Sequence, residues 1–540
     1  MERKIQLLDC TLRDGAYIVD SEFGAPAMRG IIKNLGEANI DVIECGWLKD
    51  KPHKPGTTFF HVPSDALQYI GEKKKNAIYV AMIDWDRYDL NNLPECDGKS
   101  IDAIRVVFPQ NKFREGIEVG KAVKAKGYAL YLQAANTLGY SDDELKALAE
   151  EINKAQPVCI SVVDTFGAMY PEDLQRILSV LDKHIDGGIK IGFHSHNNQQ
   201  LSFALCMDFI RIMSECGRHI VVDSSLCGMG RGAGNATTEL VANYLNVNCG
   251  ANYDMNIIMD TIDTYMQYFS ENYHWGYSIP YFIAGMFCCH VNNIAYLLKN
   301  HRTNARDMRN IIESLSPADR KKYDYDLLEQ KYILNQNRIV DDADAIKRLK
   351  TEFNGREILL IAPGETVAAK SDYILDYIAE HKPIVIGVNA IIAPYKYDYL
   401  FFTNTARYEY AGESYPDVFN ATEKILLSDI KTKAADRELI INFERAIKRG
   451  WEHFDNAVIC CLRLLSKLGV ERVKLAGFDG FKTRYNESYA DPKLPSLNPD
   501  GKWDELNEEI KDMYADVLRS APEMSVKFIT ESIFDVGEKK

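Results

Sequence analysis

The feature that most constrains the fold is a regular alternation of short apolar segments and amphipathic segments over the first 250 residues. The amphipathic stretches, such as 143–155 and 171–185, carry apolar residues at helical spacing. Nearly continuous apolar strands are typical of a parallel sheet covered by helices. The pattern therefore favours a (β/α)8 barrel over a doubly wound open sheet. The eight predicted strands are 5–11, 40–47, 76–84, 101–108, 128–135, 157–164, 189–196 and 219–226.

Nearly every predicted strand ends in a polar or ionisable residue. In a barrel of this kind the strand ends share the carboxyl-terminal face, where active sites are built. The sequence therefore predicts a polar site, and hence an enzyme, at this face. The residues at the strand ends are Arg13, Asp14, Glu44, Asp84, Arg105, Gln133, Asn136, Asp164, His194, His196 and Ser224.

Three of these residues form a candidate metal site. His194 and His196 lie two apart on one predicted strand, so their side chains face the same way. Two imidazoles and a carboxylate from Asp14 suit a divalent cation such as Mn²⁺, Mg²⁺, Co²⁺ or Zn²⁺. The alternative is a pair of ordinary core or surface histidines. Arg13 would stabilise an enolate oxygen beside the metal, or else form a structural pair with Asp14.

A glycine-rich segment, 227–239, follows the last predicted strand and opens a helix. Glycines allow tight turns and close approach of the backbone, and helix N-termini attract anions. The segment is interpreted either as a phosphate site or as a loop that delivers Asn235 toward the metal.

Several motifs together resemble the DRE-TIM metallolyases, a family that includes 4-hydroxy-2-oxovalerate aldolases, 3-hydroxy-3-methylglutaryl-CoA lyases and isopropylmalate or citramalate synthases. The resemblance covers roughly the first 300 residues. It implies metal ligation by Asp14, His194 and His196, joined in the lyase branch by Asn235. It further implies an enolate-stabilising role for Arg13, with Glu44 and Asp164 supporting the site and Tyr277 or Tyr281 assisting proton transfer. The motifs are DCTLRDG (9–15), IEC (43–45), VVDTFGAM (162–169), FHSHNN (193–198) and GMGRGAGNATTE (228–239).

The chain departs from the family directly after the RDG motif. The aldolases continue with Ser-His, and that histidine is their proposed base, whereas this chain has Ala16 and Tyr17. Tyr17 is a candidate to bind substrate or to act through a metal-bound water, since a phenol with a pKa of about 10 is a poor base at neutral pH. The Glu-Gln pair of the acyl-CoA-condensing synthases is also absent.

The resemblance implies a metal-dependent aldolase or lyase, with Mn²⁺ the foremost metal. It would make or break a carbon–carbon bond through a pyruvate-type enolate, with a 2-oxo acid and an aldehyde as substrates. One alternative is condensation of an acyl-CoA with a 2-oxo acid. Another is a non-catalytic barrel that scaffolds the rest of the chain.

The length of 540 residues exceeds what one hydrophobic core fills. We expect a barrel domain at 1–250, its helical extension at 251–345 and a second domain at 356–540. Six further apolar segments predict an open parallel, Rossmann-like sheet in the last of these. They are 356–362, 383–389, 397–404, 423–429, 471–477 and 525–530.

The second domain carries glycines and amides at its predicted strand ends, where open sheets bind nucleotides. It resembles the Rossmann-like domains of bacterial sialyltransferases and pterin-diphosphokinase-like proteins, which implies a nucleotide sugar and a place in bacterial surface-polysaccharide or sugar-acid biosynthesis. A degenerate, structural or oligomerising domain is equally compatible with the sequence. The candidate contacts are Gly364, Asn389, Asn404 and Asp479.

Charge and composition narrow the partners. The net charge of −14 argues against broad binding to nucleic acid or to anionic membranes. The chain has no apolar stretch of membrane-spanning length and begins without signal-peptide features. The 12 cysteines are scattered without a C-x-x-C pair, which predicts free thiols. We therefore expect a cytoplasmic protein, and a homo-oligomer.

Overall fold

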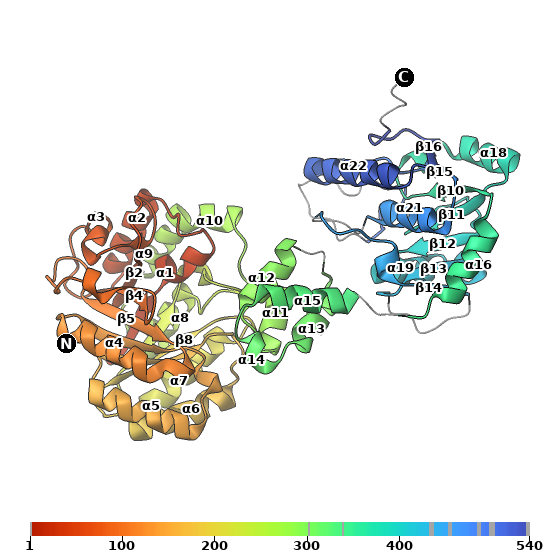
Figure 1. Cartoon of the computed structure of the whole chain (residues 1–540). Helices are drawn as coiled ribbons and strands as arrows, with labels where there is room; N and C mark the ends of the chain where they lie inside the picture. Colours follow the sequence, from red (N-terminus) through yellow and green to blue (C-terminus); the bar gives the residue numbers. More distant parts are fainter. Residues whose placement is uncertain are drawn as a thin grey trace. The chain divides into compact units, whose positions relative to one another are not determined.

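The computed structural model of the protein describes residues 3–300, 303–336, 340–430, 437–451, 456–482, 488–495 and 503–535. The chain folds into two compact units. The first is Met1–Ala295 with Leu315–Tyr323, and the second is Tyr296–Ser314 with Asp324–Lys540. Each unit contains one parallel sheet flanked by helices (Figure 1).

The sheet of the first unit is a closed barrel, as the sequence predicted. Each strand pairs in parallel with its neighbours, and β1 pairs with both β2 and β9, which closes the ring. The two-residue strand β3 (Phe59–Phe60) adds to the edge of β2. The barrel strands are β1 (Ile5–Asp9), β2 (Val42–Leu48), β4 (Ile78–Asp84), β5 (Ala103–Phe108), β6 (Ala129–Ala134), β7 (Cys159–Asp164), β8 (Lys190–Ser195) and β9 (Ile220–Ser224).

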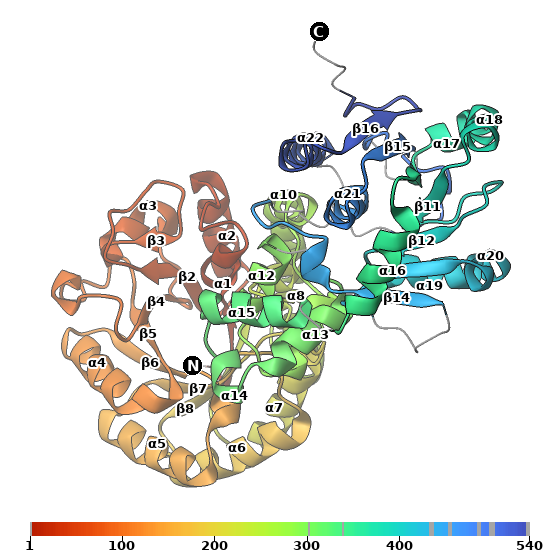
Figure 2. The same cartoon turned by 45° about the vertical axis from the view of Figure 1, so that its right-hand side comes forward.

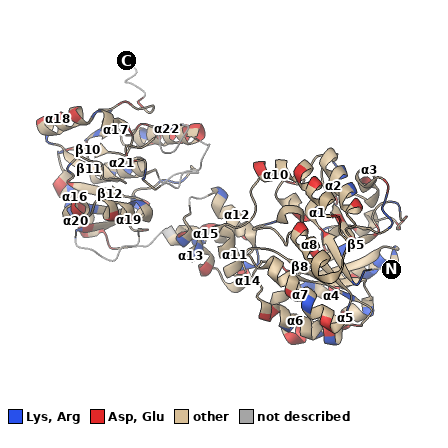
Figure 3. Ribbon diagram, turned by 180° about the vertical axis from the view of Figure 1, so that it is seen from behind, with Lys and Arg blue, Asp and Glu red and all other residues tan. Residues whose placement is uncertain are grey.

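Helices surround the barrel (Figure 2). The longer helices turn an apolar stripe inward; α5, for example, buries Leu145, Leu148 and Ile152 and begins at a capping box formed by Ser141 and Glu144. Acidic and basic residues both occur along these helices (Figure 3). The helices are α1 (Thr11–Asp14), α2 (Ala25–Glu37), α3 (Leu67–Ile70), α4 (Phe113–Ala125), α5 (Asp142–Ala155), α6 (Pro171–His184), α7 (Ser202–Cys216) and α8 (Thr238–Cys249).

Strand side chains alternate between the outer core and the barrel interior, because successive residues of a strand point to opposite faces. At the amino-terminal side the interior is apolar, with Val42, Ala103, Tyr131 and Val221 in one cluster. Two residues further along the same four strands, the inward positions are buried and polar: Glu44, Arg105, Gln133 and Asp223. The interior therefore changes from apolar to charged toward the strand ends.

A run of helices follows the barrel. The loop between α11 and α12 contains His290, and α14 belongs to the first unit. The helices are α9 (Met255–Thr261), α10 (Gln267–Asn272), α11 (Ile279–Met286), α12 (Val291–Asn300), α13 (Ala305–Ser314), α14 (Pro317–Arg320) and α15 (Tyr325–Gln336).

The second unit is built on a parallel sheet of order β14-β13-β12-β11-β10-β15-β16. The sequence analysis missed the edge strand β14, whose first three residues are only partly buried. The polar stretch 341–357 contains α16 (Ala343–Phe353), which buries Leu349 and Phe353. The strands are β10 (Glu357–Ile361), β11 (Ile384–Val388), β12 (Tyr399–Phe402), β13 (Glu423–Leu427), β14 (Glu438–Ile441), β15 (Arg472–Ala476) and β16 (Ser525–Phe528).

Six further helices that the structure describes in this unit lie between its strands along the chain. They are α17 (Thr366–Ala369), α18 (Ser371–His381), α19 (Thr405–Ser414), α20 (Pro416–Ala421), α21 (Ala457–Leu468) and α22 (Trp503–Ser520). All 12 cysteines of the chain are free thiols. Within the described ranges, no helix combines the length and the apolar character that a membrane crossing requires.

Candidate metal centre

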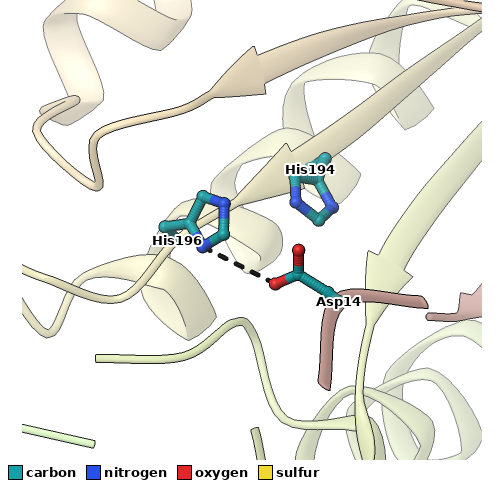
Figure 4. Close-up of side chains that lie close together, drawn as sticks. All are labelled: Asp14, His194 and His196. Carbon is teal, nitrogen blue, oxygen red and sulfur yellow. Dashed lines mark ion pairs between the residues drawn. The ribbon is translucent and has the colours of Figure 1, made fainter. Parts of the chain in front are cut away.

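Three side chains converge at the carboxyl-terminal end of the barrel. Asp14, His194 and His196 each offer a ligand atom, and these atoms all lie within 4.8 Å of one another (Figure 4). Asp14 ends α1, directly after β1, whereas His194 lies in β8 and His196 just beyond it. The rings of His194 and His196 are perpendicular, with centroids 5.1 Å apart. The barrel closure brings the start and the end of the barrel sequence to one point.

Two buried polar atoms at this cluster are candidate metal ligands. His196 Nδ1 and Asn235 Oδ1 are buried without a hydrogen-bond partner among the described residues. Asn235 adjoins both sides of the cluster, since its Nδ2 donates to Asp14 Oδ2 at 2.8 Å and its backbone bridges to His196. Buried acceptors without partners are costly, and a cation satisfies them. These residues therefore fit a divalent metal held by two imidazoles and oxygen ligands.

Gly230 makes room for this arrangement. A Cβ atom at this position would collide with Asp14 and Asn235. The glycine-rich segment thus allows the backbone to approach the cluster closely.

Charge keeps Asp14 ionised. Burial alone would raise its pKa, but Arg13 and the two histidines hold the pKa of Asp14 well below its usual range. Arg13 Nη1 donates to Asp14 Oδ1 and Arg13 Nε donates to Glu44 Oε2 at 2.8 Å. Arg13 is 5% exposed, so its guanidinium is held in one place beside the cluster.

A second buried arginine links Glu44 to His194. Arg105 Nη1 donates to Glu44 Oε2 at 2.8 Å, and Arg105 Nη2 pairs with Asp223 Oδ2. The same Asp223 oxygen lies 3.1 Å from His194 Nδ1. This places the proton of His194 on Nδ1 and leaves Nε2 free to bind a cation.

The sequence analysis missed Asp223 and named Ser224 at the end of that strand. Ser224 instead hydrogen-bonds to Leu8 O and Thr238 Oγ1, away from the cluster. The two-residue period of a strand could have identified Asp223, because this residue lies two positions after Val221, which faces the barrel interior on β9.

His196 is neutral at physiological pH. Burial lowers its pKa to about 4, with the positive charges of Arg13 and Arg231 acting in the same direction. Neutral imidazole is the form that binds metals.

Asp164 uses its carboxylate for hydrogen bonds within its own loop. Its oxygens accept from the backbone N–H groups of Ala168 and Met169, and burial raises its pKa to about 6.

Four side chains lie at the mouth of the site. The sequence analysis named Tyr17 but not Trp47, Arg231 or His290. The Arg231 guanidinium stacks 3.8 Å over the ring of Tyr17, which meets Trp47 edge-on. His290 Nδ1 accepts from Asn292 N at 3.1 Å, and His290 Nε2 lies 3.5 Å from Arg231 Nη1. Burial lowers the pKa of His290 to about 3, so the ring is neutral. The guanidinium of Arg231, beside Tyr17 and His290, therefore places a positive charge at the mouth, which suits an anion.

The two remaining tyrosine candidates differ from Tyr17. Tyr277 is 57% exposed, ahead of α11, and forms no hydrogen bond with the cluster within the described part of the chain. Tyr281 is partly buried in α11, and burial raises its pKa. Among the described residues, neither hydroxyl group hydrogen-bonds to Asp14, His194 or His196, whereas His290 of the same segment contacts Arg231.

The candidates in the second unit lie together at strand ends, but three have occupied side chains. Asn389 exchanges hydrogen bonds with Thr403, and Asn404 caps α19 by accepting from Arg407 N. Asp479 accepts from the backbone and hydroxyl groups of Thr366. Gly364 is required because a Cβ there would collide with Asp479.

Comparison with known proteins identifies relatives of the first unit. Residues 4–264 match the model of the HMGL-like family. An oxaloacetate decarboxylase from Mycobacterium tuberculosis is 26% identical over 242 residues, which is 43% of this chain and 67% of that protein. A 4-hydroxy-2-oxovalerate aldolase from Thermomicrobium roseum is 26% identical over 250 residues, which is 45% of this chain and 66% of that protein.

Solved structures also resemble this part of the chain. The N-terminal domain of a candidate aldolase from Bacteroides vulgatus is 26% identical, with a TM-score of 0.47, covering 54% of this chain and 95% of that one. The curated relatives are matched over about two thirds of their length.

Proposed function

Because the N-terminal part of this chain is an HMGL-like domain, we propose that its first unit is a divalent-metal-dependent carbon–carbon lyase of the aldolase type. Its substrates would be a 2-oxo acid and an aldehyde. The observation that carries the proposal is the cluster of Asp14, His194 and His196. At this cluster, His196 Nδ1 and Asn235 Oδ1 are buried and have no hydrogen-bond partner among the described residues. Mn²⁺ is the metal we propose first, and Mg²⁺, Co²⁺ and Zn²⁺ suit the same ligands.

Asp14, His194, His196 and Asn235 would hold the metal. A divalent cation there supplies Lewis-acid stabilisation of a 2-oxo acid. The chain adds its own donor in Arg13, whose position is fixed by Asp14 and Glu44. A preorganised guanidinium in a buried site stabilises the negative charge that develops on the ketone oxygen when the carbon–carbon bond breaks.

Tyr17, Arg231 and His290 would bind the rest of the substrate. The guanidinium of Arg231, which lies beside Tyr17 and His290, suits a carboxylate. Burial raises the pKa of Tyr17, although Arg231 opposes the shift, so the phenol keeps its proton at neutral pH. Tyr17 Oη would therefore donate a proton or a hydrogen bond to the aldehyde oxygen, and it would not act as the base.

The test uses the full chain, stripped of metal by a chelator and reloaded separately with Mn²⁺, Mg²⁺, Co²⁺ or Zn²⁺. It is incubated with a panel of 4-hydroxy-2-oxo acids and with oxaloacetate, and pyruvate is followed by a coupled lactate dehydrogenase assay. We expect metal-dependent release of pyruvate that is lost in His194→Gln. His381→Gln, an exposed histidine of the second unit, is the matched control.

Two outcomes would contradict the proposal. Release of free CoA from an acyl-CoA and a 2-oxo acid, without cleavage of any hydroxy-oxo acid, would identify a condensing synthase. Failure to bind or respond to any of the four metals, in either activity or melting temperature, would identify a scaffold.

A further inference from the structure

The second unit has a pocket at the point where its strand order reverses. The chain proceeds from β10 to β11 on one side and later returns to place β15 on the other side of β10. Because these strands are parallel, the segments that follow them meet at one edge of the sheet. A cavity of about 140 Å³ opens there, bounded by Gly364, Asn389, Asn404 and Asp479 among others. Open parallel sheets bind ligands at such reversal points.

The pocket contains a buried cation with an unused donor. Arg407 is 6% exposed, and its Nη1 has no hydrogen-bond partner among the described residues. None of the described carboxylates lies within ion-pair distance of it, and its guanidinium lies 4.8 Å from the ring centre of Tyr489. A buried charge without a partner is strongly unfavourable, so the arrangement calls for an anion.

Two helices begin at the same pocket. α19 starts after its cap Asn404, and α21 starts after its cap Asn456; both caps line the cavity. Helix N-termini carry partial positive charge and free N–H groups, which adds to the attraction of Arg407 for an anion. A planar guanidinium with paired donors matches the oxygens of a phosphate.

Another part of the wall is apolar and aromatic. Val388, Phe478, Phe481 and Phe534 line the cavity with Tyr489. Phe478 packs against Phe534 with ring centres 4.6 Å apart, and Phe481 stacks on Trp503 at 5.6 Å. A cavity of ~150 Å³ is known to hold an aromatic ring. The pocket therefore offers an anion site beside a surface for a flat ring.

We propose that this pocket binds a nucleotide, with its phosphate on Arg407 and the N-termini of α19 and α21, and its base among Phe478, Phe481 and Tyr489. The proposal goes beyond the metal-dependent reaction, because every residue that carries it lies in the second unit. Asn389, Asn404 and Asp479 shape the pocket through their bonds to the neighbouring turns, and Arg407 is the residue that recognises the ligand.

The test is calorimetric titration of the full chain with AMP, GMP, CMP and UMP, with the matching nucleosides, and with inorganic phosphate. We expect at least one nucleoside monophosphate to bind at least tenfold more tightly than both its nucleoside and phosphate. Arg407→Gln should weaken that binding by about 10- to 100-fold, the range for hydrogen bonds to charged groups. Arg348→Gln, a surface arginine paired with Glu352, is the control.

A second variant keeps the test decisive if Arg407→Gln fails to fold. Ala406 lines the pocket and is only partly buried, so Ala406→Phe should fill the cavity, leave the fold intact and abolish binding. His194→Gln should bind the nucleotide normally, which separates this site from the metal centre. Absence of binding by all four nucleotides at millimolar concentration would overturn the proposal. So would equally tight binding of phosphate alone, or binding that neither pocket variant changes.

Discussion

The carboxylate of Asp223 lies 3.1 Å from Nδ1 of His194 and fixes which nitrogen of that ring carries the proton. Asp223 is itself held by Arg105, and Arg105 reaches Glu44 and through it Arg13. Burial opposes the charge on Asp223, but Arg105 and His194 keep its pKa below its usual value. One buried network thus connects His194 to the arginine beside Asp14.

Asp223→Asn tests this relationship. An amide in place of the carboxylate loses the charge that balances Arg105 and can donate toward His194 Nδ1, which favours the wrong tautomer. We expect Mn²⁺ affinity to fall by about 10- to 100-fold, the usual effect of losing such a partner. Titration calorimetry measures this, with the partly exposed Asp208→Asn on α7 as the control. Unchanged affinity would show that His194 orients itself without Asp223.

Arg13→Gln separates rate from metal binding. We expect turnover to fall by about 10²- to 10³-fold, as for the loss of one oxyanion donor, while Mn²⁺ affinity stays within a few fold. Stability should also fall, by roughly 3–5 kcal/mol, because Asp14 and Glu44 lose a buried partner. Steady-state kinetics and metal titration on the same preparation give the answer. A parallel loss of metal and rate would mean that Arg13 acts by positioning Asp14.

Arg231→Gln tests the anion site at the mouth. The change removes the guanidinium that stacks on Tyr17 and lies beside His290. We expect KM for the 2-oxo acid to rise about tenfold, with a smaller change in kcat, because a charge-assisted contact to the substrate is lost. Arg211→Gln on the surface of α7 is the matched control. If kcat falls while KM holds, Arg231 acts on the reaction rather than on binding.

Gly230→Ala tests the close approach of the glycine-rich segment. The added methyl group would collide with Asp14 and Asn235, whereas a Cβ on Gly187 meets no atom within 4 Å. We expect Gly230→Ala to weaken metal binding at least tenfold and to cost about 1–3 kcal/mol, the usual range for overpacking. Gly187→Ala should leave both quantities unchanged. Equal behaviour of the two variants would show that the cluster tolerates a shift of this loop.

His196 should make the metal-free protein sensitive to acid. Its folded pKa is about 4, below the value of about 6.5 in the unfolded chain. As the pH falls from 6.5 toward 4, the unfolded state takes up a proton there and the folded state does not. Stability therefore falls with pH, at up to about 1.4 kcal/mol per pH unit.

The comparison of wild type with His196→Gln isolates this contribution. Between pH 7 and pH 4.5 we expect the metal-free wild type to lose about 2 kcal/mol more than the variant, measured on the barrel transition by urea unfolding. Identical pH dependence in the two proteins would mean that His196 is already solvated in the folded state.

The sequence predicted the barrel well because its evidence is local. Each strand between Ile5 and Ser224 carries its own apolar run, and parallel strands buried on both faces need little else to be recognised. The spacing of His194 and His196 likewise follows from the two-residue period of a strand. Tyr277 was a weaker inference, since a long helical segment does not reveal which side chain returns to the barrel mouth; the structure brings His290 there.

What the sequence determined by itself was therefore the order of elements, the closed barrel and the residue types at its polar end. The tertiary structure decided which of those groups meet. It joined Asp223 to His194 and Arg105 to Glu44. Within the described part of the chain, it left His196 Nδ1, Asn235 Oδ1 and Arg407 Nη1 without hydrogen-bond partners. The reason is physical. The role of a charged group or a lone pair depends on its burial and on neighbours distant in the chain, and the local spacing of residues reveals neither of these.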